Sequence, residues 1–224
     1  MSNKKQKINH NKPFTDSGEL RHAVKLYTGD DILLKQCIIN KYGNIKNWNV
    51  ENIMDMSSIF EDCRQFNEDI TNWKVDNVQI MNLMFMNCHE FNQDIGGWNV
   101  ENVQAMNYMF YDCYEFNGNI SNWNVRNVLD MEVVFSGCSK FNCDIGIWNV
   151  GNVETMDEMF AGCYQFNQDI GGWNVENVIN MCFLFCDCYQ FNHDISSWNI
   201  KKVKYMVGIF KNCHKFNNSI NGFQ

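Results

Sequence analysis

The 224-residue sequence contains a single proline, no apolar run long enough to cross a membrane and no recognisable catalytic motif. A membrane-spanning helix needs about 18 or more consecutive apolar residues, so no transmembrane segment is expected. The patterns G-x-S-x-G and H-E-x-x-H and glycine-rich phosphate loops are missing, and the five histidines have no repeated partner. We therefore predict that the protein is not an enzyme, and we expect no cofactor.

A secretory signal is also missing, because the first twelve residues, MSNKKQKINHNK, are polar and basic with no apolar stretch behind them. We predict a flexible basic tail over residues 1–12, which includes Lys4, Lys5, Lys7 and Lys12. The expected location is intracellular, with a place on a virion or at a surface as the alternative.

What the sequence does have is a period of 25 residues. The thirteen residues FNQDIGGWNVENV occur at 91–103 and again at 166–178, and every tryptophan obeys the same period. The tryptophan column consists of Trp48, Trp73, Trp98, Trp123, Trp148, Trp173 and Trp198. Columns of methionine, phenylalanine and cysteine keep the same phase, which indicates an array of stacked repeats that share one core.

The spacing inside each repeat predicts an α/β repeat. Met81, Met84, Phe85 and Cys88 recur at three and four residues, as on one face of a helix, so a short helix is predicted over 79–88. The stretch 93–98 is predicted to be a short strand that pairs in parallel with its equivalents, followed by a turn at residues 99–102. About seven coils follow one another in this prediction.

The domain prediction has three parts: the tail, an N-terminal cap over residues 13–47 made of a helix and a first partial coil, and seven repeats over 48–224 with a partial eighth that ends at Phe223. Leu20, Ala23, Val24 and Tyr27 have helical spacing, so one face of a helix at 17–28 is predicted to seal the first coil. The C-terminal end shows no comparable helix, which raises the hypothesis of a homo-oligomer formed through that end.

Eleven cysteines allow a disulfide or metal interpretation, yet seven of them occupy one apolar column. We predict buried, reduced thiols at these seven positions. They are Cys63, Cys88, Cys113, Cys138, Cys163, Cys188 and Cys213. The run CFLFCDC at 182–188 lacks the second ligand pair of a zinc site, so no metal is predicted there.

Two polar columns accompany the apolar ones. Asparagine recurs at positions 52 to 177 and at positions 67 to 217, and we predict ladders of hydrogen bonds between neighbouring coils. The aspartate column at 69, 94, 144, 169 and 194, with Asn119 and Ser219 as departures, is predicted to cap turns, with calcium binding as the alternative.

The unit MNLMFMNCHEFNQDIGGWNVENV resembles the BspA-like leucine-rich repeat family, in the tryptophan-containing form found in mycoplasma-type surface proteins of unknown function and in large DNA viruses. The stretch ELRHAVKLYTGDDILLKQCIINKYGNIKNWNV is similar to that family's entry cap. The resemblance implies a right-handed leucine-rich-repeat-like solenoid and no reaction. Members of that family with an assigned role are adhesins or binding surfaces.

Charge is unevenly distributed. Residues 48–200 hold 22 acidic and 4 basic residues, whereas the two ends hold 4 acidic and 14 basic residues. An acidic array repels phosphate, so nucleic acid is not expected to bind along it.

The leading functional hypothesis is a protein–protein interaction scaffold that uses a variable, mostly acidic outer surface. The candidate partner surface is one variable column, formed by Glu51, Asp76, Glu101, Arg126, Glu176 and Lys201. The alternative is a structural or assembly component, such as part of a virus particle, that self-associates through its C-terminal end.

Overall fold

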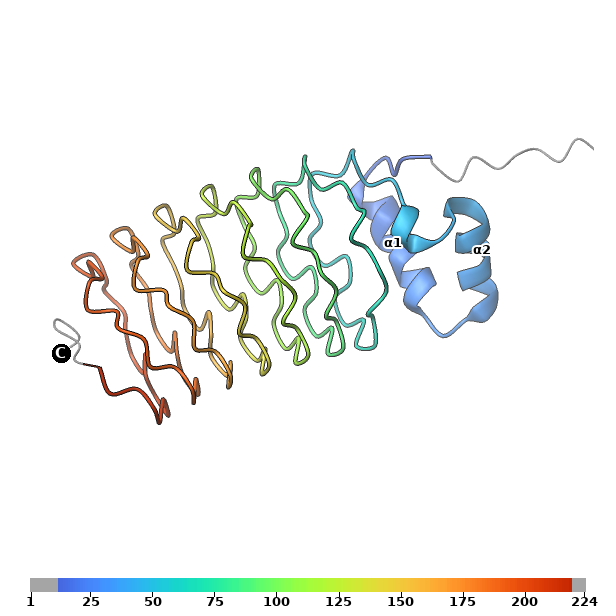
Figure 1. Ribbon diagram of the computed structural model, residues 1–224. Helices are drawn as coiled ribbons and strands as arrows, with labels where there is room; N and C mark the ends of the chain where they lie inside the picture. Colours follow the sequence, from blue (N-terminus) through green and yellow to red (C-terminus); the bar gives the residue numbers. More distant parts are fainter. Residues whose placement is uncertain (1–11, 219–224) are drawn as a thin grey trace, which may run out of the picture.

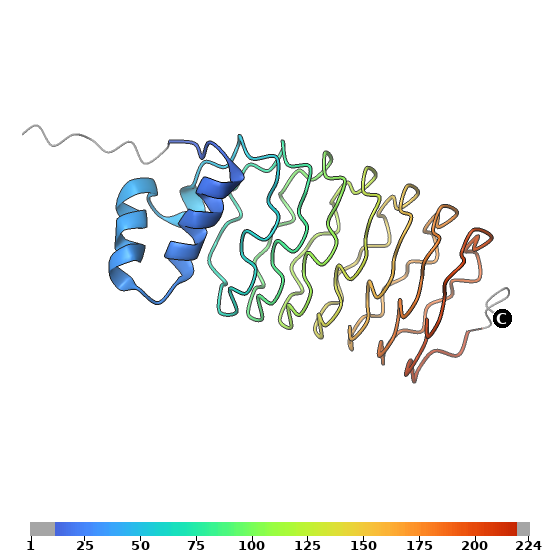
Figure 2. The ribbon, with the colours of Figure 1, turned by 180° about the vertical axis from the view of Figure 1, so that it is seen from behind.

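The computed structural model describes residues 12–218. Two helices, α1 (Ser17–Thr28) and α2 (Ile32–Tyr42), and a short 3-10 helix, η1 (Ile45–Asn47), precede the repeats. Figures 1 and 2 show α1 and α2 at one end of an array of coils that lie side by side along the rest of the chain. Most of the predicted basic tail, together with Ser219 and Phe223, lies outside the described residues.

Helix α1 covers the range that the spacing of its apolar residues predicts. Asp16 caps it by accepting a hydrogen bond from the Glu19 amide, and Leu20, Ala23, Val24 and Tyr27 are buried. Because these four side chains lie on one face, the helix closes the end of the core.

Helix α2 was not predicted from the sequence. The Asp31 carboxylate caps it by accepting from two backbone amides, and Gly43, at φ 81°, ends it with a hydrogen bond to Ile39 O. Only Ile38 and Tyr42 of this helix are buried. Its apolar residues therefore form no continuous buried stripe, and the helical period was hard to recognise.

Backbone hydrogen bonds join each coil to the next. Ile80 forms isolated parallel bridges with Asp55 on one side and Ala105 on the other, and such bridges continue to Tyr205. After each bridge, alternate amides donate to carbonyls 24 residues later, as Met81 does to Ala105 and Phe85 to Met109. These bonds, in place of a sheet, hold the coils in register.

The predicted α/β repeat, with a strand and a helix in every coil, is wrong. Within residues 48–218 the structure has turns and isolated bridges, with no helix and no sheet, so it does not support a right-handed leucine-rich-repeat-like solenoid of parallel strands. The segment 79–88 is not a helix, and 93–98 is not a strand.

Backbone conformation explains why the helix prediction failed. Leu83 and Asn87 have positive φ values of 56° and 61°, and every repeat has positive-φ residues at the same two positions, so neither a helix nor a strand continues through the segment. The amides of Met84 and Cys88 donate to carbonyls three residues earlier. Consecutive turns of this kind reproduce the three- and four-residue spacing of a helix.

The predicted strand fails for a different reason. Around residues 92–98 the coils are joined through side chains: the Asn92 amide donates to Asn67 Oδ1 at 2.9 Å, and the Trp98 indole donates to Ile70 O at 3.3 Å. Extended backbone that pairs through side chains forms no ladder and no strand.

The core is a continuous stack of aromatic and sulfur-containing side chains. The ring of Phe85 lies parallel to Phe60 at 5.3 Å and to Phe110 at 5.5 Å between centroids. Indole rings also stack, as in the 6.4 Å pair Trp123–Trp148. Such contacts bury surface that a single coil leaves exposed.

The polar ladders predicted from the sequence are confirmed. Asn142 N donates to Asn117 Oδ1 at 2.8 Å, and Asn127 Nδ2 donates to Glu101 O at 2.7 Å, with the same pattern in neighbouring repeats. Where Lys202 replaces asparagine, its Nζ donates to Asn177 Oδ1 instead.

The aspartate column caps turns, as predicted, in each described member. Asp94 Oδ1 accepts from the Gly96 amide at 3.0 Å, and the same bond two residues on is made by Asp69, Asn119, Asp144, Asp169 and Asp194.

Candidate functional site

One side of the array carries four neighbouring columns of side chains that differ between repeats. We call it the bridge face and define it by the four columns that begin at Ser57, Ser58, Glu61 and Asp62, just after the bridges. The columns between them, which begin at Ile59 and Phe60, point inward and are buried in most repeats. The bridge face is therefore one of the surfaces on which one coil differs from the next.

A groove of about 350 Å³ crosses the bridge face over four successive coils. Small residues line part of it, at Ser136, Gly137, Ala161 and Gly162. Larger side chains complete the lining: Tyr111, Asp112, Glu158, Phe183, Cys186 and Asp187. The groove thus combines a shallow floor, two aromatic rings and three carboxylates.

Two glycines make the groove possible. Gly137 and Gly162 have φ values of 78° and 73°, in the left-handed region where other repeats place Asp or Asn. A Cβ on Gly137 would lie 2.1 Å from Asp112 Oδ1, which shows that the Asp112 carboxylate occupies the space above this glycine. The missing side chains leave a hollow that the Asp112 carboxylate overhangs.

The surroundings of the groove are strongly acidic. Five carboxylates belong to the central coils of this face, Asp112, Glu132, Asp157, Glu158 and Asp187, and Asp130 lies beside it at a bridge position. The three ion pairs found among residues 12–218 lie elsewhere, joining Lys35 to Glu68, Lys41 to Glu19 and Lys140 to Glu115. This face therefore carries excess negative charge in the described structure.

Burial raises the pKa of the carboxyl groups of Asp112, Glu132 and Asp157, and nearby carboxylates raise that of Glu132 further. The negative charge of Asp112, followed by burial, raises the pKa of the Tyr111 hydroxyl. Asp157 Oδ1 is buried and accepts no hydrogen bond from residues 12–218. A positive charge placed here would relieve both the repulsion and the desolvation.

The last described coil brings one cation to the end of the groove. Lys211 Nζ lies 6.0 Å from the ring centroid of Phe183. Asp187 accepts there from Asn212 Nδ2 at 2.7 Å and from the Cys186 thiol at 3.2 Å. Burial, followed by the Asp187 carboxylate, raises the pKa of Cys186 to about 11.

The candidate partner surface from the sequence lies in different columns. Glu51, Asp76, Arg126, Glu176 and Lys201 are exposed and Glu101 is half-buried, and they belong to turns that follow the tryptophans. None of these six residues lines the groove. The signal that sequence reasoning missed is the pair of small residues at 136–137, repeated at 161–162.

All seven tryptophans and six of the seven column cysteines are buried. Cys63, in the first coil, is the half-buried exception. The six buried thiols donate to the backbone carbonyl of a phenylalanine in the preceding coil, for example Cys88 to Phe60 O at 3.0 Å. Sequence reasoning placed these thiols in the core without foreseeing the hydrogen bond.

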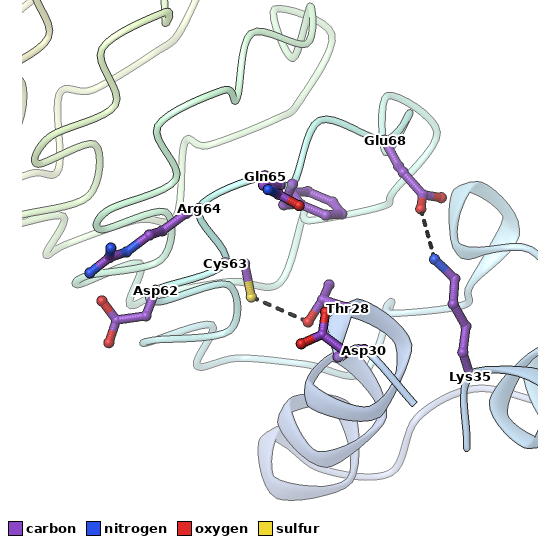
Figure 3. A pocket seen from close by; sticks show the side chains of 10 residues that line it. Thr28, Asp30, Lys35, Asp62, Cys63, Arg64, Gln65 and Glu68 are labelled. Atoms are coloured by element: carbon purple, nitrogen blue, oxygen red, sulfur yellow. Dashed lines mark hydrogen bonds and ion pairs between the residues drawn. The ribbon is translucent and has the colours of Figure 1, made fainter. Parts of the chain in front are cut away.

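A second hollow, of about 580 Å³, lies where the helical cap meets the first repeats. Figure 3 shows Cys63 facing Thr28, with a 3.4 Å contact between Sγ and Oγ1, and Lys35 reaching Glu68 at 3.5 Å. Burial raises the pKa of the Cys63 thiol. The lining holds two cationic and three anionic side chains, so it has no strong preference for a ligand of one charge.

Residues 12–218 offer no candidate for two other classes of site, a membrane-spanning helix and a metal centre. Neither helix in this part of the chain has the length and apolar character to cross a bilayer. The same residues contain no gathering of three or more His, Cys, Asp or Glu side chains suited to a metal ion.

Comparison with known proteins gives a family without a function. No curated protein matches the chain. One family model, described as "Mycoplasma protein of unknown function, DUF285", matches twice, over residues 33–146 and 129–224. Together the two matches span the repeats and all but the first residue of helix α2, and the chain therefore belongs to the DUF285 family.

Proposed function

We propose that this protein is a non-enzymatic scaffold that binds a partner protein through the acidic bridge face. The observation that carries the proposal is the groove between Tyr111 and Phe183, which combines small floor residues, two aromatic rings and three carboxylates on this face. A rigid array with one distinctive, charged hollow is suited to recognising a partner of opposite charge.

The core supports this role, because its function is to hold the face in place. Each coil is fixed to its neighbours by backbone amides, asparagine side chains and indole donors, for example Trp123 Nε1 to Ile95 O at 3.1 Å. A preorganised surface loses little conformational entropy when it binds.

A reducing, intracellular compartment belongs to the proposal. Six column thiols act as hydrogen-bond donors, which requires the protonated, reduced form. We also propose kinship with the BspA-like proteins, on the strength of the repeat residues. Binding surfaces are the role assigned to characterised members of that family.

Site-specific photo-crosslinking tests the proposal. A photoreactive phenylalanine analogue at Tyr111 would probe the groove, and the same analogue at Asn122, an exposed residue outside the bridge face, is the matched control. We expect a discrete protein adduct from position 111, in cells that express the protein, and none from position 122.

The second part of this experiment repeats the crosslinking at high ionic strength. Raising the ionic strength of a lysate to about 1 M shortens the screening length to about 3 Å, so the adduct at position 111 should disappear. Adducts that are the same from both positions, or that persist at high salt, would contradict a charge-guided partner site.

A second candidate function is self-assembly through the last coil. Val203, Met206 and Phe216 are half-buried, whereas their equivalents in the preceding coil are buried. Partly exposed apolar surface of this kind favours association. Sedimentation that shows a single monomeric species at tens of micromolar would exclude it.

A further inference from the structure

We propose that the groove binds the side chain of a lysine or arginine presented by an extended segment of the partner protein. This inference rests on the proposed function and names the chemistry of the partner. It depends on the shape of the groove, on the placement of its carboxylates and on its aromatic ends.

The shape suits one long side chain. The floor of the groove at Gly137 and Gly162 has no side chains, and Ser136 and Ala161 add only small ones. A long side chain of the partner can therefore lie across the coils. A volume of about 350 Å³ lies near the lower limit for small-ligand sites, which excludes a folded element as the occupant.

The carboxylates surround this floor. Asp112 overhangs Gly137 from the third coil, Glu158 lies in the fifth coil, and Asp187 lies in the sixth. No side chain among residues 12–218 forms an ion pair with any of the three. An ammonium or guanidinium group entering the groove gains attraction from all three in a partly desolvated site.

The aromatic rings provide the second, independent indication. Lys211 Nζ already lies over the ring of Phe183 at 6.0 Å, so this protein itself places a cation against one wall of the groove. Tyr111 provides a comparable ring at the opposite end of the lining. The apolar stem of a lysine or arginine can pack on such rings while its charge meets the carboxylates.

Other occupants fit less well. Phosphate groups of nucleic acids or lipids are repelled by the acidic side chains of this face. A metal ion is disfavoured because the described residues form no metal-ligand group of three or more.

The test uses five synthetic heptapeptides that differ in the central residue: lysine, arginine, Nε-acetyl-lysine, norleucine or glutamate. Binding to the 15N-labelled full-length chain is followed by amide chemical-shift changes. We expect the lysine and arginine peptides to shift the amides of residues 136–137 and 161–162, with dissociation constants on the order of 1 mM. Acetylation should weaken binding at least about tenfold, because it removes the charge.

Charge-matched variants locate the site. The triple variant D112N/E158Q/D187N removes three charges from the groove, and E51Q/D76N/E101Q removes three from the exposed turn column. We expect the first to lose at least about tenfold in affinity for the lysine peptide and the second to change less than about twofold. The single variant E158Q is the control for misfolding, because the Glu158 side chain makes no hydrogen bond with residues 12–218.

The outcomes separate the inference from the proposed function. Equal binding of the acetyl-lysine peptide, or binding that persists in the groove variant, overturns the inference. If position 111 still crosslinks a partner in that case, the scaffold function stands and only the lysine or arginine chemistry fails. Dimers of the free chain that block the peptide would place a second copy in the groove and overturn the inference as well.

Discussion

The thiol of Cys113 donates a hydrogen bond to the backbone carbonyl of Phe85, 28 residues earlier, at an Sγ–O distance of 3.0 Å. Both groups lie in the core, out of reach of water, and the same bond links five further pairs of coils. Phe85 O also accepts from the Cys88 amide at 2.9 Å, so the thiol adds a second donor to this carbonyl while keeping the small size of an apolar residue.

The first prediction concerns this bond. Cys113→Ala removes one of the two donors to Phe85 O, which keeps the Cys88 amide, so we expect a loss of about 0.5 to 1.5 kcal/mol in the free energy of unfolding. Cys113→Ser keeps a donor and should lose less. Urea unfolding provides the measurement, and Cys37→Ala, at an exposed position, should change stability by less than about 0.5 kcal/mol. Equal losses for the alanine and serine variants would show that packing alone matters.

The second prediction concerns thiol reactivity. The thiolate is the reactive form, and the pKa of Cys186 is raised to about 11, so its rate of alkylation should increase by about tenfold per pH unit until pH approaches 11. At pH 8 exposed Cys37 should react first and Cys113 last. Mass spectrometry of timed iodoacetamide reactions measures each rate. A rate for Cys186 that levels off below pH 9 would contradict the environment described here.

The third prediction uses one chemical change at two positions in neighbouring repeats. Asn117 accepts a hydrogen bond through its side-chain oxygen, whereas Asn127 donates one through its side-chain nitrogen to Glu101 O. Asn117→Asp keeps the acceptor and should be nearly neutral. Asn127→Asp replaces the donor with a charged acceptor beside a carbonyl, and should cost about 1 to 3 kcal/mol in thermal or urea unfolding. The reverse order of the two losses would refute the assignment of the ladders.

The fourth prediction concerns the floor of the groove. Gly137→Ala places a Cβ 2.1 Å from Asp112 Oδ1 at a φ of 78°, and we expect a loss of about 1 to 3 kcal/mol. Asp112→Ala in the same chain should restore part of it. At Gly97 an added Cβ meets nothing within 4 Å, so Gly97→Ala is the control and should change stability by less than about 1 kcal/mol in urea unfolding. Equal losses at both glycines would contradict the packing of Asp112 over Gly137.

The fifth prediction concerns acid. The Thr15 amide and the Tyr42 hydroxyl donate to the Glu19 carboxylate, and the pKa of Glu19 is lowered from 4.5 to about 2 despite opposing desolvation. A lowered pKa stabilises the folded state above pH 4.5, and this contribution is lost as pH falls towards 2. Glu19→Gln should therefore be less stable than the natural chain at pH 6, with a difference that shrinks by pH 2.5, as measured by urea unfolding. A difference that does not change with pH would rule out this linkage.

The helix at Ser17–Thr28 could be predicted because four apolar residues at helical spacing follow a capping aspartate. The groove could not be predicted from the sequence, because it depends on which residues of separate repeats lie next to one another. Ser136–Gly137 and Ala161–Gly162 look like ordinary variation until stacking places them side by side.

The sequence by itself determined the period, the inward columns and the polar ladders, because a coil of 25 residues can bury its apolar side chains only against near-copies of itself. The tertiary structure decided the path of the backbone inside each coil. Residues with left-handed backbone conformation, such as Leu83 and Asn87, give the chain consecutive turns, and the amides left free by these turns donate to the next coil. The three- and four-residue spacing of apolar residues fits both a helix and consecutive turns, and this backbone conformation makes it turns.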